Sequence, residues 1–411
     1  MAHEFFFQVR SVEDVLKEIL SFPRLRAQEV SLLQGRGRFL ASDLLAPEDL
    51  PPYSRATMDG YAVRARDCFG ARENEPVILK VIGEIKMGQV PGFELGPGQA
   101  ARIATGGMLP PGADAVVMVE YTEEIGDLVE IRRPVAPGEN VISKGEDVAQ
   151  GEVVFKKGTR ITPGHIGLLA GLGVTSLRVH ARPQVGIIST GDELVPPEED
   201  LKPGQIRDIN TYTLASAVEE AGGRAILYGI VPDDQKALIE TVQRVFSETE
   251  VVLISGGSSV GTRDFTLAAI SALPGAELLA HGVAVRPGKP TILAKGEGKA
   301  IFGLPGQVAS ALLVFYILVR PLILHLQGAR QKDLFLPKVW ARVTRNLPSA
   351  QGREDYYRVK LRADKEGYLA EPIFKRSGLI SSMAEADGLL KIPERSEGLY
   401  EGESAEVFLL P

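Results

Sequence analysis

Two stretches of the chain, VVLISGGSSVGTRD (251–264) and QVGIISTGDELV (184–195), decide the fold. Each begins as a continuous apolar run typical of a buried strand and continues into Ser or Thr, Gly and acidic residues. Short apolar runs alternate with helical patterns through this part of the chain, which predicts a parallel sheet covered by helices on both faces. The predicted strands are Val185–Ser189, Ala225–Val231, Val251–Ser255 and Ala300–Phe302, and the predicted helices are Thr211–Ala221, Gln235–Glu248, Asp264–Leu273 and Val308–Leu326.

The rest of the chain divides around this α/β region. A length of 411 residues is too great for one hydrophobic core, which stops growing near roughly 250–300 residues. Helical spacing over Val12–Leu20, after a capping Ser11, predicts a first helix. Frequent Gly and Pro between β-prone runs predict β-rich structure over 51–157, and a small β-domain without a helix after Gln327. The predicted units are 1–23 (a helix packing on the central domain), 24–50 with 148–182 (a linking domain), 51–147 (β-rich), 183–328 (α/β) and 329–411 (C-terminal β-domain).

Composition excludes several classes of protein. Lys plus Arg (46) against Asp plus Glu (53) gives a net charge of −7, which disfavours a nucleic-acid binder held by a basic face. A single cysteine and five histidines exclude an internal disulfide and a Cys-rich zinc site, so we expect the reducing cytoplasm. The N-terminus MAHEFFFQVR does not resemble a secretory signal. The apolar run Ala309–Val319 stops at Arg320 and Pro321, short of the roughly 20 residues of a spanning helix, so we expect a buried helix and no membrane.

Two loops of similar composition lie where a ligand is expected. In open parallel sheets, ligands bind outside the carboxyl ends of the strands. Glycines let backbone amides approach an anion, and hydroxyl groups donate to phosphate oxygens. Tight turns with capping side chains are the alternative for either loop alone. The candidate cofactor-binding residues are Ser189, Thr190, Gly191 and Asp192 in the first loop, and Ser255, Gly256, Gly257 and Ser258 in the second.

Acidic residues form a second group of candidates. Carboxylates beside a phosphorylated ligand would repel it unless Mg²⁺ bridges the protein and the pyrophosphate. The sequence therefore predicts a magnesium site that includes Asp233 and Asp264, although either residue alone could simply cap the helix that follows it. The acids considered are Asp59, Asp147, Asp192, Glu193, Asp233, Asp234 and Asp264.

Cations follow further along the chain. VRPGKP (285–290) presents Arg286 and Lys289 on a restricted Gly and Pro scaffold, which suits an oxyanion, although an exposed basic turn fits as well. It is not a Walker loop, because the glycine spacing is one residue too long and Pro290 stands where Ser or Thr should be. GLPGQVAS (303–310) then enters the last long helix, with Pro305 and Ser310 near a helix start that could receive an anion.

One literal match indicates a different chemistry. GSSVG (257–261) spells the GxSxG of a nucleophile elbow, with Asp264 and His281 or His325 downstream in hydrolase order. An elbow needs its serine to pass directly into a helix, whereas helical periodicity is predicted only from Asp264. We therefore disfavour a serine hydrolase.

Taken in order, the motifs resemble the molybdopterin molybdotransferase family, MoeA, which includes the E-domain of gephyrin. They span nearly the whole chain, so the resemblance is specific. The matching segments are PPYSRATMDGYAV (51–63), RIATGGMLPPGADAVVMVE (102–120), KGEDV (144–148), STGDELV (189–195), VPDD (231–234), SGGSSVGTRD (255–264), RPGKP (286–290), GLPG (303–306), GREDYYRV (352–359) and SGLISSMAEADGLL (377–390).

The resemblance implies a fold, a reaction and partners. The fold is an elongated homodimer of four-part subunits, with a MogA-like molybdopterin-binding α/β domain, β-rich domains, a barrel-like C-terminal β-domain and active sites between subunits. The reaction joins adenylylated molybdopterin and molybdate with Mg²⁺, giving molybdenum cofactor and AMP. The implied partners are a MogA-type adenylyltransferase and molybdoenzyme maturation proteins.

The resemblance also assigns residues. It places Asp192 and Glu193 in the pterin and phosphate region. The acids expected to be needed for activity, Glu193 included, are Asp59, Asp147, Glu193, Asp233 and Asp264. The expected molybdate-binding set, with Pro305 in its GLPG loop, is Arg286, Lys289, Ser310, Arg353 and Ser377.

Three departures from the family pattern accompany the match. Gln307 and Val308 replace Asn and Pro in GLPGNPVS, Ala56 replaces a serine before MDGYA, and Ser258 makes SGGSS from SGGVS. The changed loop at Gln307 leaves a tungstate-selective paralogue as an alternative. A non-catalytic gephyrin-like scaffold is the other, although a scaffold has no chemical need for the acidic and cationic residues.

Overall fold

The two stretches that decide the fold form neighbouring strands in the middle of a six-stranded sheet. The protein is described here by a computed structural model that covers residues 9–256 and 260–411. The strands run in the order β16 (Arg224–Val231), β13 (Gln184–Thr190), β17 (Val251–Ser255), β21 (Lys299–Leu304), β20 (Ile292–Gly296) and β18 (Glu277–His281).

The four predicted strands pair in parallel, as expected, and two further antiparallel strands make the sheet mixed. β16, β13, β17 and β21 are parallel, whereas β20 and β18 are each antiparallel to the strand before them in the order. The two antiparallel strands carry ILAKG and ELLAH, whose apolar runs are too short to be recognised alone. Pairing of β20 with β21, and of β18 with β20, makes them strands, and such pairing is a tertiary effect.

Helices cover both faces of the sheet. α3 (Asn210–Glu220), the N-terminal α1 (Val12–Ser21) and the last long helix share a core with one face, and α4 (Gln235–Glu248) and α5 (Val260–Ser271) share a core with the other. α1 begins after Ser11, whose hydroxyl accepts a hydrogen bond from the Asp14 amide. α5 begins at Val260, four residues before the predicted start at Asp264, so the reason given against a nucleophile elbow was wrong.

The last long helix is continuous but not uniform. α6 (Val308–Val314) passes through a π-helical turn (Phe315–Val319) into α7 (Arg320–Leu326). Pro321 lacks an N–H and its ring would clash in a regular turn, and the wider turn before it relieves both problems. The apolar run stops at Arg320, but the helix continues to Leu326, as predicted. It is the one helix of the described residues long and apolar enough to cross a membrane, but 78% of its most apolar window is buried, as in a soluble core helix.

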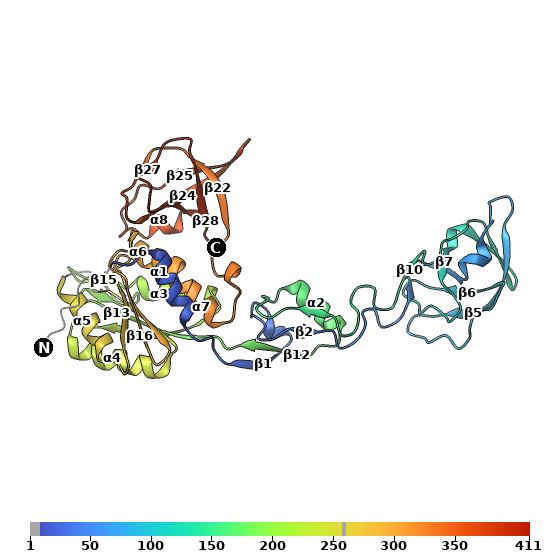
Figure 1. The fold of residues 1–411 in the computed structure, drawn as a ribbon, viewed down its shortest axis with the longest axis horizontal. Coiled ribbons are helices and arrows are strands. Elements are labelled where there is room, and N and C mark those ends of the chain that lie inside the picture. The colour runs from blue at the N-terminus through green and yellow to red at the C-terminus, as the bar shows by residue number, and fades with distance from the viewer. Residues whose placement is uncertain (1–8, 257–259) are drawn as a thin grey trace.

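The other units extend away from the α/β domain, and the molecule is elongated (Figure 1). β1 (Ala27–Ser31) pairs with β12 (Ser176–His180) as a narrow ribbon that leads into the linking region. This region also holds β2 (Leu44–Leu45), β11 (Val153–Phe155) and α2 (Pro163–Gly171). Beyond it lies a distal six-stranded sheet in the order β7 (Ala115–Met118), β4 (Gly60–Val63), β6 (Gln99–Ile103), β5 (Val77–Ile85), β9 (Leu128–Ile131) and β8 (Thr122–Ile125).

The C-terminal unit is a small closed barrel beside the α/β domain. Its strands follow the order β24 (Glu354–Asp364), β25 (Gly367–Pro372), β22 (Lys338–Val343), β28 (Ser404–Leu409) and β26 (Gly388–Ile392), and β26 closes on β24. A short helix, α8 (Ser381–Ala384), interrupts a region predicted to have none. The remaining short strands are β3 (Arg55–Ala56), β10 (Val141–Ile142), β14 (Leu194–Val195), β15 (Ile206–Arg207), β19 (Val285–Arg286), β23 (Leu347–Pro348) and β27 (Gly398–Leu399).

Candidate active site

The carboxyl ends of the parallel strands bring the predicted loops together. Ser189 of β13 stands opposite Ser255 of β17, and Ser255 stands opposite Leu304 of β21. The chain leaves β13 in one direction towards β16 and returns on the other side to β17, so a ligand crevice is expected between these strands. Gly256 has φ +140°, and a Cβ there would lie 2.2 Å from the Thr190 hydroxyl. Only glycine allows the two loops this close approach.

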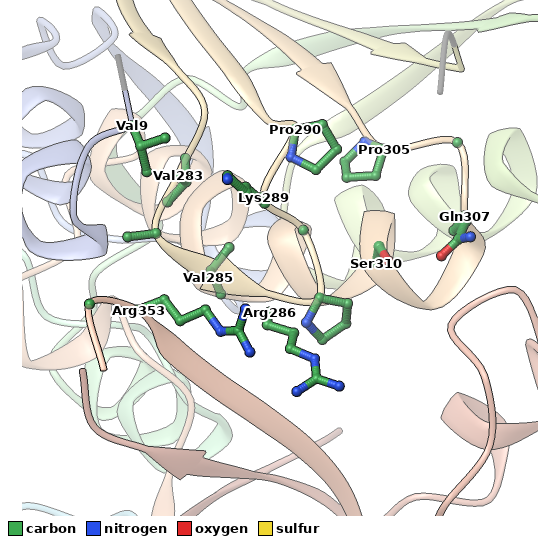
Figure 2. Close-up of a pocket in the computed structure, with 15 residues that line it drawn as sticks. Val9, Val283, Val285, Arg286, Lys289, Pro290, Pro305, Gln307, Ser310 and Arg353 are labelled. Atoms are coloured by element: carbon green, nitrogen blue, oxygen red, sulfur yellow. The ribbon is translucent and has the colours of Figure 1, made fainter. Parts of the chain in front are cut away.

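A first cavity, of about 530 Å³, lies beside the start of α6 (Figure 2). It collects one group of predicted residues from β19, the loop after it, the loop after β21, and the residue before β24. Their cations and hydroxyl suit a tetrahedral dianion. The predicted residues lining it are Arg286, Lys289, Pro305, Ser310 and Arg353.

A buried carboxylate orients two of these cations. Asp355, with 1% of its side chain exposed, accepts from Nε of Arg353 at 2.8 Å and from Nη1 of Arg286 at 3.3 Å. β19 pairs in parallel with β24 and places Arg286 opposite Asp355. Asp355 stands inside the GREDYYRV motif but was not among the predicted site residues. Its role depends on a pairing between two domains that no local pattern reveals.

A second cavity, of about 430 Å³, lies over the ends of β13 and β17. It collects the other group of predicted residues, which are hydroxyls, glycines and carboxylates: Thr190, Gly191, Glu193, Asp233, Ser255 and Gly256. Asp192 lies beside it and accepts a hydrogen bond from the Asp233 amide at 3.0 Å. Burial, and then repulsion from Asp192 and Glu193, raises the pKa of Asp233. No positive charge among the described residues compensates this carboxylate, and a divalent cation would relieve that environment.

A buried polar network supports the floor of the second cavity. Ser189 is itself buried, and its hydroxyl bonds Asp208 at 3.1 Å and Thr211 at 2.9 Å. Asn210 donates from Nδ2 to the Ser255 hydroxyl at 2.7 Å and to the Gly306 carbonyl at 2.9 Å. Its Oδ1 is buried and has no hydrogen-bond partner among the described residues. Asp208 and Asn210 both line this cavity, and the sequence analysis missed both.

Gln307 forms a wall shared by the two cavities. It and Gly306 line both of them. The Ser377 hydroxyl, from the segment before α8, donates to Gln307 Oε1. Ser377 therefore contacts the side chain that departs from the family pattern, while the adjacent Gly378 lines the second cavity.

Two predicted acids lie far from both cavities within one chain. Asp59 is exposed and directly precedes β4 of the distal sheet, at the opposite end of the molecule from α6 (Figure 1). Asp147 is exposed on the segment between β10 and β11, where its amide donates to the Leu50 carbonyl. Asp59 Oδ1 accepts from the Thr105 amide at 2.6 Å and from its hydroxyl at 2.9 Å, and these bonds lower the pKa of Asp59. Within a single subunit these two acids therefore do not join Glu193 and Asp233 at the second cavity.

Other predicted residues cannot be placed. Gly257 and Ser258 lie outside the described residues, as does the side chain of Asp264, although its backbone belongs to α5. Among the described residues, no group of three His, Cys, Asp or Glu side chains forms a metal site. Of the hydrolase candidates, His325 is buried in α7 with Nε2 2.9 Å from the Phe22 carbonyl, and burial lowers its pKa.

The fold and the cavities define a class of protein. A cationic cavity and a hydroxyl- and acid-lined cavity meet at the strand ends of an α/β domain, which is typical of a protein that binds a phosphorylated cofactor and an oxyanion. Family models match the N-terminal region of MoeA (domains I and II) over residues 10–173, a probable molybdopterin binding domain over 186–325, and the C-terminal region of MoeA (domain IV) over 340–410.

Full-length relatives give the same result. A putative molybdopterin biosynthesis protein of Methanocaldococcus jannaschii is 38% identical over 98% of each chain. A molybdopterin molybdenumtransferase of a Nostoc species is 35% identical over 98% of this chain and 94% of its own. A crystal structure of the molybdopterin biosynthesis MoeA protein of Pyrococcus horikoshii superposes with a TM-score of 0.85 at 43% identity, over 98% of this chain and 99% of that one. The chain belongs to the MoeA family and is a molybdopterin molybdenumtransferase of molybdenum cofactor biosynthesis.

Proposed function

We propose that the protein inserts molybdate into adenylylated molybdopterin with Mg²⁺ and releases AMP. The observation that carries this proposal is the pair of cavities joined at Gln307. In the first cavity, Arg286 and Arg353, fixed by Asp355, would hold the molybdate dianion. In the second, backbone amides and hydroxyls of the strand-end loops would hold the pterin phosphate. The shared wall would place the oxyanion next to the pterin dithiolene.

Magnesium fits the second cavity by the chemistry of its donors. Asp233 and Asp264 would hold the ion, and the raised pKa of Asp233 supports this because an adjacent cation would offset the repulsion from Asp192 and Glu193. When bound, Mg²⁺ would supply charge neutralisation of the pyrophosphate as AMP leaves. Hydrogen bonds from the Thr190 and Ser255 hydroxyls would orient the phosphate for this departure.

We also propose a homodimer that acts in the cytoplasm and receives its substrate from a MogA-type adenylyltransferase before delivery to molybdoenzyme maturation proteins. Asp59 beside β4 and Asp147 between β10 and β11 are exposed, and within one chain neither lines either cavity. A second copy would bring its distal acids to the first copy's cavities, so that each site is complete only in the dimer.

The experiment is an anaerobic assay with adenylylated molybdopterin, Mg²⁺ and either molybdate or tungstate. We expect AMP release that depends on both Mg²⁺ and the oxyanion, with metal-loaded pterin formed in equal amount. The rates of AMP release with molybdate and with tungstate, measured in parallel, show which oxyanion the loop at Gln307 prefers. Tight pterin binding without AMP release would contradict the proposal and would favour a scaffold.

A further inference from the structure

A third cavity, here called the rear cavity, lies at the opposite edge of the α/β sheet from the active site. Its volume is about 770 Å³, and it shares no lining residue with the first or second cavity. Gln184, Arg224 and Lys299, the first residues of β13, β16 and β21, line one side. Arg38 and Gln28 of the linking region line the other. The rear cavity is therefore a junction between two domains, under the amino ends of the parallel strands.

The rear cavity is cationic, although the protein as a whole carries a net charge of −7. Three glutamates line it, and two of them accept hydrogen bonds from backbone amides: Glu250 from Gln184 at 2.7 Å and Glu219 from Ala225 at 2.8 Å. Lys299 donates to the Phe246 carbonyl at 2.6 Å. The basic residues lining the cavity are Arg24, Arg26, Arg38, Arg182, Arg224 and Lys299.

Four arginines of this cavity have no acidic partner among the residues that the structure describes. Within the part of the chain that the structure describes, no carboxylate lies within ion-pair distance of Arg24, Arg26, Arg182 or Arg224. Elsewhere in the same residues, arginines commonly pair, as Arg330 does with Asp333. Unpaired guanidinium groups gathered around one space repel one another unless an anion lies among them.

Arg38 is the strongest indication of a ligand. Only 6% of this residue is exposed, yet its guanidinium has no carboxylate partner among the described residues. Nη2 donates to the His180 carbonyl, and Nε is buried without a hydrogen-bond partner among those residues. Burial, and then the charge of Arg182, lowers the pKa of Arg38. A buried cation with unused donors is costly, and an anion in the cavity would offset that cost.

We propose that the rear cavity binds a small ligand through a phosphoryl group, with Arg38, Arg182 and Arg224 as its principal contacts. Guanidinium groups bind phosphate oxygens in pairs of parallel hydrogen bonds. The volume exceeds what a single oxyanion fills and lies in the range of small-molecule sites, so a phosphate ester of nucleotide size also fits. Because the contacts come from both domains, the ligand would hold the linking region against the α/β domain.

The test separates this site from the active site by mutation. The double variant Arg286→Gln, Arg353→Gln removes the two cations of the first cavity that Asp355 orients. In this background, binding of inorganic phosphate is measured by calorimetry at constant ionic strength. Adding Arg182→Gln and Arg224→Gln, both exposed residues, is expected to weaken the remaining phosphate binding by about tenfold or more. Adding Arg395→Gln instead, an exposed arginine outside the cavity, should leave it unchanged.

Two ligands distinguish the source of the phosphoryl group. The comparison is made on the binding that is lost when Arg182→Gln and Arg224→Gln are added, because AMP is also the proposed product at the active site. A larger loss for AMP than for inorganic phosphate would identify a phosphate ester, and an equal loss would identify the free anion; either result supports the site. The proposal is overturned if the first-cavity substitutions abolish all phosphate and AMP binding, or if the rear-cavity substitutions change neither. In the Arg286→Gln, Arg353→Gln background, phosphate should also raise the Tm by more than it does when Arg182→Gln and Arg224→Gln are added.

Discussion

At the scale of single residues, the raised pKa of Asp233 has a consequence for stability. The folded state binds the proton of the Asp233 carboxyl more tightly than the unfolded state does, so protonation stabilises the fold. This contribution to the free energy of unfolding is complete below the unfolded pKa of about 3.8 and is lost as pH rises through the folded pKa. The side-chain amide of the Asp233→Asn variant is neutral at every pH in this range. In EDTA at pH 7 the variant should therefore have a higher Tm than the wild type, and the difference should disappear at about pH 3.

The same pair of proteins tests the metal. Added Mg²⁺ should raise the Tm of the wild type and have little effect on the Asp233→Asn variant, because binding to the folded state alone stabilises it. Equal Tm values in EDTA at pH 7 would show that the carboxylates do not repel one another. Equal responses to Mg²⁺ would exclude Asp233 as a ligand.

Asn210 offers a second prediction. Asn210→Ala removes the bonds to Ser255 and Gly306 and should lower the free energy of unfolding by about 1–3 kcal/mol. Since the unpartnered Oδ1 lies at the second cavity, the variant should also raise KM for adenylylated molybdopterin, with molybdate affinity unchanged. Urea titration and steady-state assays measure the two effects. Ser216→Ala, an exposed change on the same helix, serves as control, and an unchanged KM would remove Asn210 from the binding site.

Sequence reasoning reached many of the residues that line the cavities but few of those that support them. Thr190 and Ser255 were found because strand-end hydroxyls beside glycine form a local pattern. Asp355 and Asn210 were missed because their partners come from other elements, β19 and the loop after β21. A local pattern cannot contain a contact between residues that only the fold brings together.

At the scale of elements, the pairing of β19 with β24 joins the α/β domain to the C-terminal barrel at the site itself. Asp355→Asn removes the charge that holds Arg286 and Arg353, whose side chains are 56% and 35% exposed. The free energy of unfolding should fall by about 1–3 kcal/mol, since both arginines keep part of their hydration. The dissociation constant for molybdate should rise about tenfold.

Equilibrium dialysis with molybdate measures this change without relying on turnover. Asp364→Asn, at the far end of the same strand, removes a partly exposed charge paired with Arg342 and should leave molybdate binding unaltered. If Asp355→Asn binds molybdate as well as the wild type does, the carboxylate does not position the arginines.

The helix from Val308 to Leu326 is central to the α/β core. Phe315, in its π-helical turn, is fully buried, so Phe315→Ala should lower the free energy of unfolding by about 3–5 kcal/mol. Trp340→Ala, where the side chain is 63% exposed, should change it by less than about 0.5 kcal/mol. Urea unfolding followed by circular dichroism compares the two, and a similar loss in both would show that the turn is not part of the core.

Elements were predicted well where their pattern is local. α4 and β17 have the predicted bounds, because the pattern of an amphipathic helix or of a buried apolar strand is contained within the element itself. β18 and β20 were not predicted, because their apolar runs are short. The early start of α5 was also unforeseen, because VGTR has no apolar periodicity of its own.

At the scale of the whole molecule, the position of the distal acids predicts complementation between inactive chains. Asp59→Asn and Arg353→Gln should each abolish activity, since one alters the distal domain and the other the first cavity. If each site takes its distal domain from the partner, a refolded mixture should recover roughly a quarter of wild-type activity, because mixed dimers hold one intact site.

A matched mixture provides the control. Asp59→Asn with Asp147→Asn places both changes in the part of the chain that the partner is proposed to supply, so no mixed dimer has an intact site and no activity should return. Absence of recovery in the first mixture, once mixed dimers are demonstrated by tagged capture, would place all catalytic residues within one chain or remove Asp59 from catalysis.

Gln307 separates the first and second cavities with one flexible side chain, and the Ser377 hydroxyl holds it in place. A ligand that displaces this side chain from either cavity changes the shape of the other in the same movement. If the two cavities hold the two substrates as proposed, we expect their binding to be coupled through Gln307, so that the first ligand to bind changes the affinity for the second.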